Sequence, residues 1–327
     1  MTNQEYLGNL LAPYGPALPL ETLAEELNKI YHSFEAPSYD ARHPEIHQQL
    51  PPLWAEMIGL ARQWRPGGRF RILDFGCGTG FEAQQVMLNL GPESIASLTC
   101  YDPSSEMLDR CRQALASARV PIRFVRTTEQ LMGLDTTYNL VVTNSLLHHL
   151  PRPAALLSDL HSIIEPHAIW LAGHEPSARF FRNAECYEVF RDYNQRVSKR
   201  KLFSPGAYLR RARMTMGLDA NPAASTATVS QRNGLFQRKP PRSVIGRVVD
   251  YHVPHSPDEA RDGRGFDFQQ LAMVLDSIWR LEWVKSYAFL GQYLETALTP
   301  EWQARARSLA AKYPLDGASF CSAWRRA

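Results

Sequence analysis

The chain has 327 residues and a formal net charge of +3, a length that predicts one large domain or a core with a sizeable insertion. This charge is too small to indicate a nucleic acid or a membrane surface as partner. No apolar run reaches the roughly 18 residues of a membrane span, and the N-terminus lacks a signal-peptide pattern. The five cysteines form no CxxC pair, and no histidine cluster has metal-ligand spacing. We therefore expect reduced thiols, a cytoplasmic location and no metal site.

The first 66 residues predict a cap of helices. Residues 21–34 repeat apolar side chains at helical spacing. Residues 50–64 form a second amphipathic pattern, which ends at Pro66-Gly67-Gly68. We therefore expect an N-terminal helical cap over residues 1–66.

Strands and helices alternate after this cap. Apolar runs predict strands at residues 69–75, 97–102, 122–126, 138–144 and 168–173. Helical patterns lie between them, at residues 81–90, 103–118 and 153–164. Apolar strands that alternate with helices favour a parallel, doubly wound α/β sheet.

A long, basic and proline-containing segment, residues 177–264, interrupts this alternation. We interpret its basic residues as a solvated helix face rather than a polyanion site, and residues 243–254 as an extra strand. The alternation then resumes with a helix, a strand, a helix and a last strand, at residues 266–281, 282–291, 300–314 and 317–324. We expect a core over residues 67–176 and 265–327, with 177–264 as a lid inserted after the fifth strand.

A glycine-rich turn follows the first core strand. Gly76, Gly78 and Gly80 let the backbone turn sharply and approach a ligand closely, and the next helix begins with free N–H groups. The spacing is G-x-G-x-G, not the G-x-G-x-x-G of dinucleotide sites. The turn suits a carboxylate or a ribose better than a diphosphate; a purely structural turn is the alternative.

Asp102 ends the second predicted strand, 22 residues after Gly80. An acidic residue there can accept hydrogen bonds from both hydroxyls of a ribose. Alternatively, Asp102 caps the following helix, a role that Ser104 could also fill. We favour the ligand role.

Three stretches in order, LDFGCGTG, YDPSSEML and YNLVVTNSLLHHLP, resemble the class I S-adenosylmethionine-dependent methyltransferases. The resemblance covers about residues 68–175, with weaker likeness in the closing helix–strand pattern. It implies a Rossmann-like, mostly parallel sheet of seven strands and S-adenosylmethionine as cofactor.

The family's roles carry over where positions match. The resemblance implies that Asp74 and the three glycines line the methionine part and the ribose, that Asp102 holds the ribose hydroxyls, and that Met107 packs on adenine. Thr127-Thr128-Glu129 stands where the family commonly has an acidic residue bound to the adenine amino group. We include Thr128 among the expected cofactor-binding residues.

The fourth strand delivers polar side chains to the expected reacting centre. Asn144 either orients the nucleophile or the cofactor's amino group, or stabilises the turn. His148 or His149 is a candidate general base, although the same ending occurs in the family without a catalytic role. His174 and Glu175, after the fifth strand, are similarly placed.

Tyrosines of the cap and lid are candidates for completing the site. Tyr31 and Tyr39 either surround the sulfonium by cation–π attraction and hold the cofactor's carboxylate, or pack the cap on the core. Tyr187 of the lid is a candidate for the acceptor side. An aromatic lid indicates a small, enclosed substrate.

Our leading hypothesis is methyl transfer to an oxygen or nitrogen of a small molecule, in a monomer or homodimer. A second hypothesis is cyclisation of the cofactor, in which its α-amine attacks Cγ and yields azetidine-2-carboxylate and methylthioadenosine. A third is a non-catalytic cofactor-binding partner of another enzyme. A nucleic-acid methyltransferase is disfavoured because no recognition module is present and N-P-P-[YF] is missing after the fourth strand.

Overall fold

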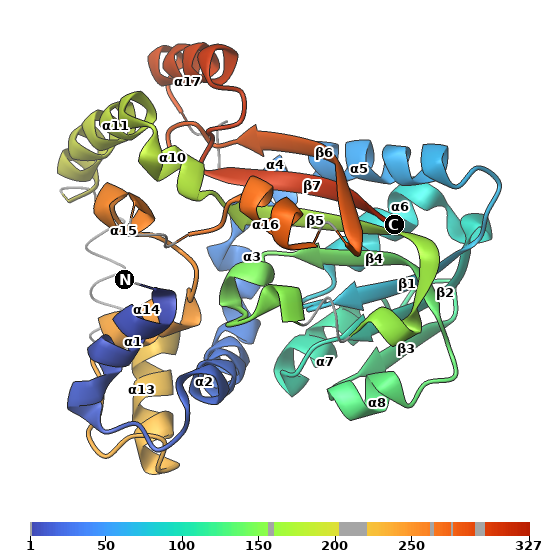
Figure 1. The fold of residues 1–327 in the computed structure, drawn as a ribbon, viewed down its shortest axis with the longest axis horizontal. Helices are drawn as coiled ribbons and strands as arrows, with labels where there is room; N and C mark the ends of the chain where they lie inside the picture. Colours follow the sequence, from blue (N-terminus) through green and yellow to red (C-terminus); the bar gives the residue numbers. More distant parts are fainter. Residues whose placement is uncertain (1, 156–159, 203–220, 262–264, 276, 292–297) are drawn as a thin grey trace.

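A seven-stranded sheet forms the centre of the molecule (Figure 1). The computed structural model describes residues 2–155, 160–202, 221–261, 265–275, 277–291 and 298–327. The strands lie in the order β3-β2-β1-β4-β5-β7-β6. Their bounds are β1 Phe70–Phe75, β2 Ile95–Tyr101, β3 Ile122–Val125, β4 Tyr138–Asn144, β5 Ile164–Pro176, β6 Trp279–Tyr287 and β7 Ser319–Arg326. Only β7 runs antiparallel to its neighbours, which confirms the mostly parallel, seven-stranded fold.

Apolar side chains on both faces of the sheet explain the doubly wound arrangement. Successive residues of a strand point to opposite faces: Ile72 joins one buried cluster and Leu73 the other. Helices α5 (Pro51–Trp64), α6 (Phe81–Leu90), α7 (Ser105–Ala114) and α17 (Pro300–Lys312) contribute to the first cluster. Helices α8 (Thr128–Met132) and α16 (Phe268–Leu275) contribute to the second.

A third apolar cluster lies beside the sheet and joins distant parts of the sequence. It is formed by α1 (Asn3–Leu11), α2 (Leu20–Glu35), α13 (Pro222–Arg232) and α14 (Arg242–Val249), which lie together at the lower left of Figure 1. The first two belong to the predicted cap and the other two to the predicted lid, whereas α5 packs against the sheet. Helices of the cap and of the lid thus share one core.

The remaining elements are shorter or lie at the edges. They are η1 (Ala12–Tyr14), η2 (Ala36–Ser38), α3 (Tyr39–Arg42), α4 (Pro44–Gln49), η3 (Pro92–Ser94), η4 (Leu147–His149), η5 (Leu160–Ile163), α10 (Ala178–Arg182), α11 (Ala184–Leu202) and α15 (Pro257–Arg261). Within the described ranges, no helix combines the length and apolar character that crossing a membrane requires.

The structure corrects three predicted elements. The strand at residues 243–254 is wrong: α14 is a helix whose buried Val244, Ile245, Val248 and Val249 share one face. The helix predicted at 266–281 ends at Leu275, and β6 begins at Trp279. Of the helix predicted at 153–164, residues 156–159 lie outside the described residues, and residues 160–163 form a 3-10 turn.

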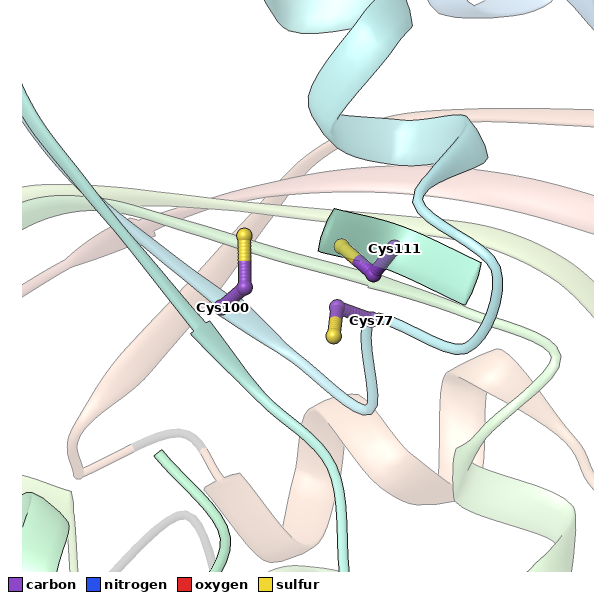
Figure 2. Close-up of side chains that lie close together, drawn as sticks. All are labelled: Cys77, Cys100 and Cys111. Atoms are coloured by element: carbon purple, nitrogen blue, oxygen red, sulfur yellow. The ribbon is translucent and has the colours of Figure 1, made fainter. Parts of the chain in front are cut away.

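Three cysteines fill the space beneath the glycine turn. Figure 2 shows Cys77 from the turn, Cys100 from β2 and Cys111 from α7 with their side chains close together. All three are fully buried and unpaired by disulfides. A Cβ built on Gly80 would come within 3.0 Å of the Cys111 sulfur, and Gly80 has φ +93°. Position 80 therefore favours glycine for two reasons: a side chain would press on Cys111, and the backbone has a positive φ.

Candidate functional site

A cavity of about 410 Å³ opens at the carboxyl ends of β1, β2 and β4, where ligands bind in open α/β sheets. We call it the first cavity. Of the residues predicted to hold the cofactor, it is lined by Tyr39, Gly76, Gly78, Asp102, Met107, Thr128 and Asn144. The structure thus brings these seven together from five separate segments.

The glycine turn forms one wall of the first cavity. Gly76 and Gly78 have φ of +81° and +48° and line the cavity. The N–H of Gly76 donates to the carbonyl of Tyr101 at 2.8 Å, and the N–H of Gly78 donates to Oδ2 of Asp102 at 3.0 Å. Gly80 is the N-cap of α6 and packs on Cys111 instead.

Asp102 is buried and held by the backbone. In addition to the bond from Gly78, its Oδ1 accepts the N–H of Ser104 at 2.9 Å. The N-cap of α7 is Ser104, whose hydroxyl accepts the N–H of Met107, so Asp102 does not have the capping role. Burial raises the pKa of Asp102 to about 6, against the lowering effect of the two backbone hydrogen bonds.

Asp74 does not line the first cavity. It lies fully buried at the end of β1, behind the glycine turn. Burial, together with the neighbouring Glu82, raises the pKa of its carboxyl well above the usual range. The contact predicted between Asp74 and the methionine part of the cofactor therefore stays a prediction.

Part of the wall of the first cavity is aromatic. The rings of Phe75 and Tyr101 stack with centroids 4.4 Å apart, and the Tyr101 hydroxyl lies 3.4 Å from the hydroxyl of Thr128. Met107 and Glu129 line the same region. A flat, apolar surface edged by polar groups suits a purine ring.

Asn144 connects the first cavity to the helix beneath it. Its Oδ1 accepts the indole N–H of Trp54 at 3.3 Å. Burial raises the pKa of Glu82 to about 8, while a hydrogen bond with Asn144 opposes this rise. The amide is therefore fixed by two partners from different helices.

A second cavity, of about 250 Å³, adjoins the first. The two share His32, Tyr39, Ser145 and His149. The wall of the second cavity is otherwise rich in ionisable side chains, and includes Tyr31, Glu35, His43, Glu45, His148, His174 and Asp250. Of these two cavities, Tyr31 lines only the second, whereas Tyr39 lines both.

His148 is tied to Glu175 across the ends of two neighbouring strands. Oε1 of Glu175 accepts the N–H groups of Leu146 and Leu147, each at 2.9 Å. Oε2 accepts the N–H of His148 and contacts its Nδ1 at 2.8 Å. Burial lowers the pKa of His148 to about 3, and raises the pKa of Glu175 to about 7 against the effect of its backbone hydrogen bonds.

Glu35 organises the cap side of the second cavity. This buried carboxylate lies 3.4 Å from Nδ1 of His32, 3.3 Å from Nε2 of His43 and 3.5 Å from Nε of Arg42. Burial disfavours the charged form of His43, but its hydrogen bonds to Glu35 and Glu45 raise its pKa to about 9. His43 is therefore a cation at neutral pH.

Tyr187 lies apart from the other predicted site residues. It belongs to α11, and its ring packs against Phe181 and Phe190. It lines neither of the two cavities. A tyrosine within an amphipathic helix gives no indication of which neighbour it faces.

Apart from Tyr31, sequence reasoning did not select the cavity-lining residues of α2, nor those of the segment after α14. Asn28 and His32 of α2 line the first cavity, and Glu35 and Asp250 line the second. The sequence indicated only weakly that His32 is a site residue, since it lies within a short run of aromatic residues. Asp250 was not selected, because it lies within residues 243–254, which we predicted as a strand, whereas in the structure it ends helix α14.

Comparisons with known proteins found one matching family and several similar proteins. Residues 72–167 match the family described as "Methyltransferase domain". The biotin biosynthesis bifunctional protein BioCD of Bordetella avium is 31% identical over 130 residues, which are 39% of this chain and 25% of that protein. The ubiquinone biosynthesis O-methyltransferase of Photobacterium profundum is 30% identical over 125 residues, 37% of this chain and 49% of that protein.

The chain thus spans from a quarter to about half of the length of these relatives. Among solved structures, the plantazolicin methyltransferase BpumL in complex with a monoazolic desmethylPZN analog and SAH has a TM-score of 0.44 and 12% identity, with 94% of this chain and 98% of that chain covered. Residues 72–167 of this chain are therefore similar to a methyltransferase domain. A match to a methyltransferase domain is consistent with S-adenosylmethionine, the cofactor that the sequence resemblance implies.

Proposed function

We propose that this protein transfers the methyl group of S-adenosylmethionine to an oxygen or nitrogen atom of a small molecule. The observation that carries this proposal is the pair of cavities with a common wall of His32, Tyr39, Ser145 and His149. The first cavity accommodates the cofactor, and the second, of about 250 Å³, accommodates a small acceptor. Methyl transfer needs such an arrangement because both reactants must meet in one water-poor space.

The residues of the first cavity fit the cofactor. A Cβ placed on Gly78 meets no protein atom within 4 Å, so the space beside this glycine belongs to the cavity and is left open for a ligand. In the proposal, Asp102 accepts the ribose hydroxyls, Met107 and Thr128 contact the base, and Tyr39 lies beside the sulfonium. The cofactor supplies an electrophilic methyl group.

The chain's part in the reaction is mainly alignment. Asn144 lines the first cavity, His148 the second and His149 both, so in the proposal these three orient the acceptor toward the first cavity. Tyr187 is assigned no part, because it lies on neither cavity. Tyr31 faces the acceptor side rather than the cofactor.

Cyclisation of the cofactor is the alternative that the same fold could host. It needs no acceptor and would leave the second cavity without a function, and the known proteins that we compared give it no support. The two reactions differ in their products: methyl transfer yields S-adenosylhomocysteine, whereas cyclisation yields methylthioadenosine.

The test is to incubate the protein with methyl-labelled S-adenosylmethionine, alone and with a panel of small alcohols, phenols, carboxylic acids and amines. We expect S-adenosylhomocysteine and a labelled product only when an acceptor is present. Methylthioadenosine formed without an acceptor would overturn the proposal in favour of cyclisation. Tight cofactor binding without turnover across the panel would overturn it in favour of a non-catalytic partner.

A further inference from the structure

Two histidines and an aspartate converge on the second cavity from distant parts of the chain. His148 and His149 belong to η4, after β4, and Asp250 follows α14. One ligand atom from each of the three lies within 4.8 Å of the other two. All three line the second cavity, so a small ion has a route to them.

Each imidazole is oriented by a hydrogen bond at Nδ1. Nδ1 of His148 lies 2.8 Å from Oε2 of Glu175, and Nδ1 of His149 lies 2.8 Å from the carbonyl oxygen of Val249. When Glu175 is ionised, both partners are acceptors, so the proton of each neutral ring belongs on Nδ1 and the lone pair on Nε2. Metal-binding histidines are held in this way, with the second nitrogen bound to a carboxylate or a backbone carbonyl.

We propose that His148, His149 and Asp250 bind a divalent transition-metal ion such as Zn²⁺ or Fe²⁺, and that this ion binds the oxygen of the methyl acceptor. Two imidazoles and one carboxylate are a donor set that suits these ions and leaves coordination positions open. The cluster reaches the wall between the two cavities through His149, which lines both. An acceptor atom bound there is adjacent to the cofactor.

The claim that the ion binds the acceptor oxygen rests on the proposed function. It narrows the class of methyl acceptor to alcohols, phenols or carboxylic acids. A bound cation lowers the pKa of a hydroxyl that coordinates it. The hydroxyl proton passes to water, the oxygen forms a bond to the methyl carbon, and the carbon–sulfur bond breaks with its electron pair remaining on sulfur. The products are the methylated acceptor, S-adenosylhomocysteine and one proton.

Ion binding is tested on the full-length protein, stripped with a chelator and titrated by calorimetry with Zn²⁺ alone. We expect one equivalent to bind, with affinity at least about 10- to 100-fold weaker in Asp250→Ala. Glu45→Gln is the matched control, because Glu45 lines the same cavity outside the cluster. Its affinity for Zn²⁺ should be unchanged. Visible absorption of bound Co²⁺ should likewise change in Asp250→Ala and not in Glu45→Gln.

Asp250 does not line the first cavity, so Asp250→Ala should still bind S-adenosylhomocysteine, which shows that the variant is folded. Absence of stoichiometric Zn²⁺ binding by the wild-type protein, or equal affinity in the variant, would overturn the ion site. These measurements need no acceptor. A protein that binds the ion but transfers no methyl group would disprove the proposed function alone, and one that transfers methyl groups without binding the ion would disprove the site alone.

Discussion

Nδ1 of His148 lies 2.8 Å from Oε2 of Glu175, and this contact joins the end of β4 to the end of β5. The carboxylate also accepts three backbone N–H groups, from Leu146, Leu147 and His148. One buried side chain therefore sets both the backbone of η4 and the orientation of an imidazole that faces the second cavity. A carboxylate has the acceptor-only character that this position needs.

Replacement of Glu175 by Gln should lower the free energy of unfolding by about 1–3 kcal/mol, because an amide NH₂ would face groups that now donate to the carboxylate. Urea denaturation measures this change. Glu301→Gln is the control, since Glu301 is exposed and its ion pair of 3.5 Å with Arg305 is worth little. Equal stabilities of the two variants would contradict the role assigned to Glu175.

Gly78→Ala and Gly80→Ala should separate cofactor binding from stability. At Gly78 the new methyl group would enter the first cavity, so affinity for S-adenosylhomocysteine should fall while the φ of +48° costs only about 1 kcal/mol of stability. At Gly80 the φ of +93° and the approach to Cys111 should lower the free energy of unfolding by about 1–3 kcal/mol. Calorimetry and urea denaturation of both variants measure the two effects. If the two variants showed equal losses of affinity and equal losses of stability, the separate roles assigned to Gly78 and Gly80 would be wrong.

Cofactor binding should depend on pH through Asp102. Burial raises the pKa of this carboxyl to about 6, so the charged form that accepts ribose hydroxyls is present above that value and is lost as pH falls below it. Below about pH 6, affinity for S-adenosylhomocysteine should approach a tenfold decrease per pH unit. Calorimetric titrations between about pH 5 and pH 8 measure this slope. Asp102→Asn should bind weakly throughout, without this slope; a slope that persists in the variant would assign the titration to another group.

Tyr39→Ala should weaken cofactor binding, because Tyr39 lines both cavities beside the proposed sulfonium position. Loss of a cation–π contact and of the ring's packing should cost about 1–2 kcal/mol of binding free energy. Tyr187→Ala is the matched control: its ring packs within the α10–α11 region and lines neither cavity. Calorimetric titration with S-adenosylmethionine should show weaker binding by Tyr39→Ala, and binding by Tyr187→Ala as tight as that of the wild type. Weaker binding by Tyr187→Ala together with unchanged binding by Tyr39→Ala would instead indicate that Tyr187 contacts the cofactor.

Much of the sheet was predictable because its strands are short apolar runs separated by glycine, proline and helical patterns. The segment at residues 243–254 was not, because an apolar run of this length fits either a strand or a buried helix. Only packing against α1 and α2 shows that Val244, Ile245, Val248 and Val249 face one apolar cluster as a helix. The same packing places Asp250 on the second cavity.

The amino-acid sequence by itself determined the sheet, the glycine turn and Asp102, because each depends on local chemistry: apolar strands, positive φ and an acidic residue at a strand end. The tertiary structure alone decided which side chains of the helical segments reach the cavities. Tyr187 and Asp250 both lie in the predicted lid, yet only Asp250 meets His148 and His149. Contacts between residues about a hundred positions apart follow from how helices pack, and no local spacing encodes them.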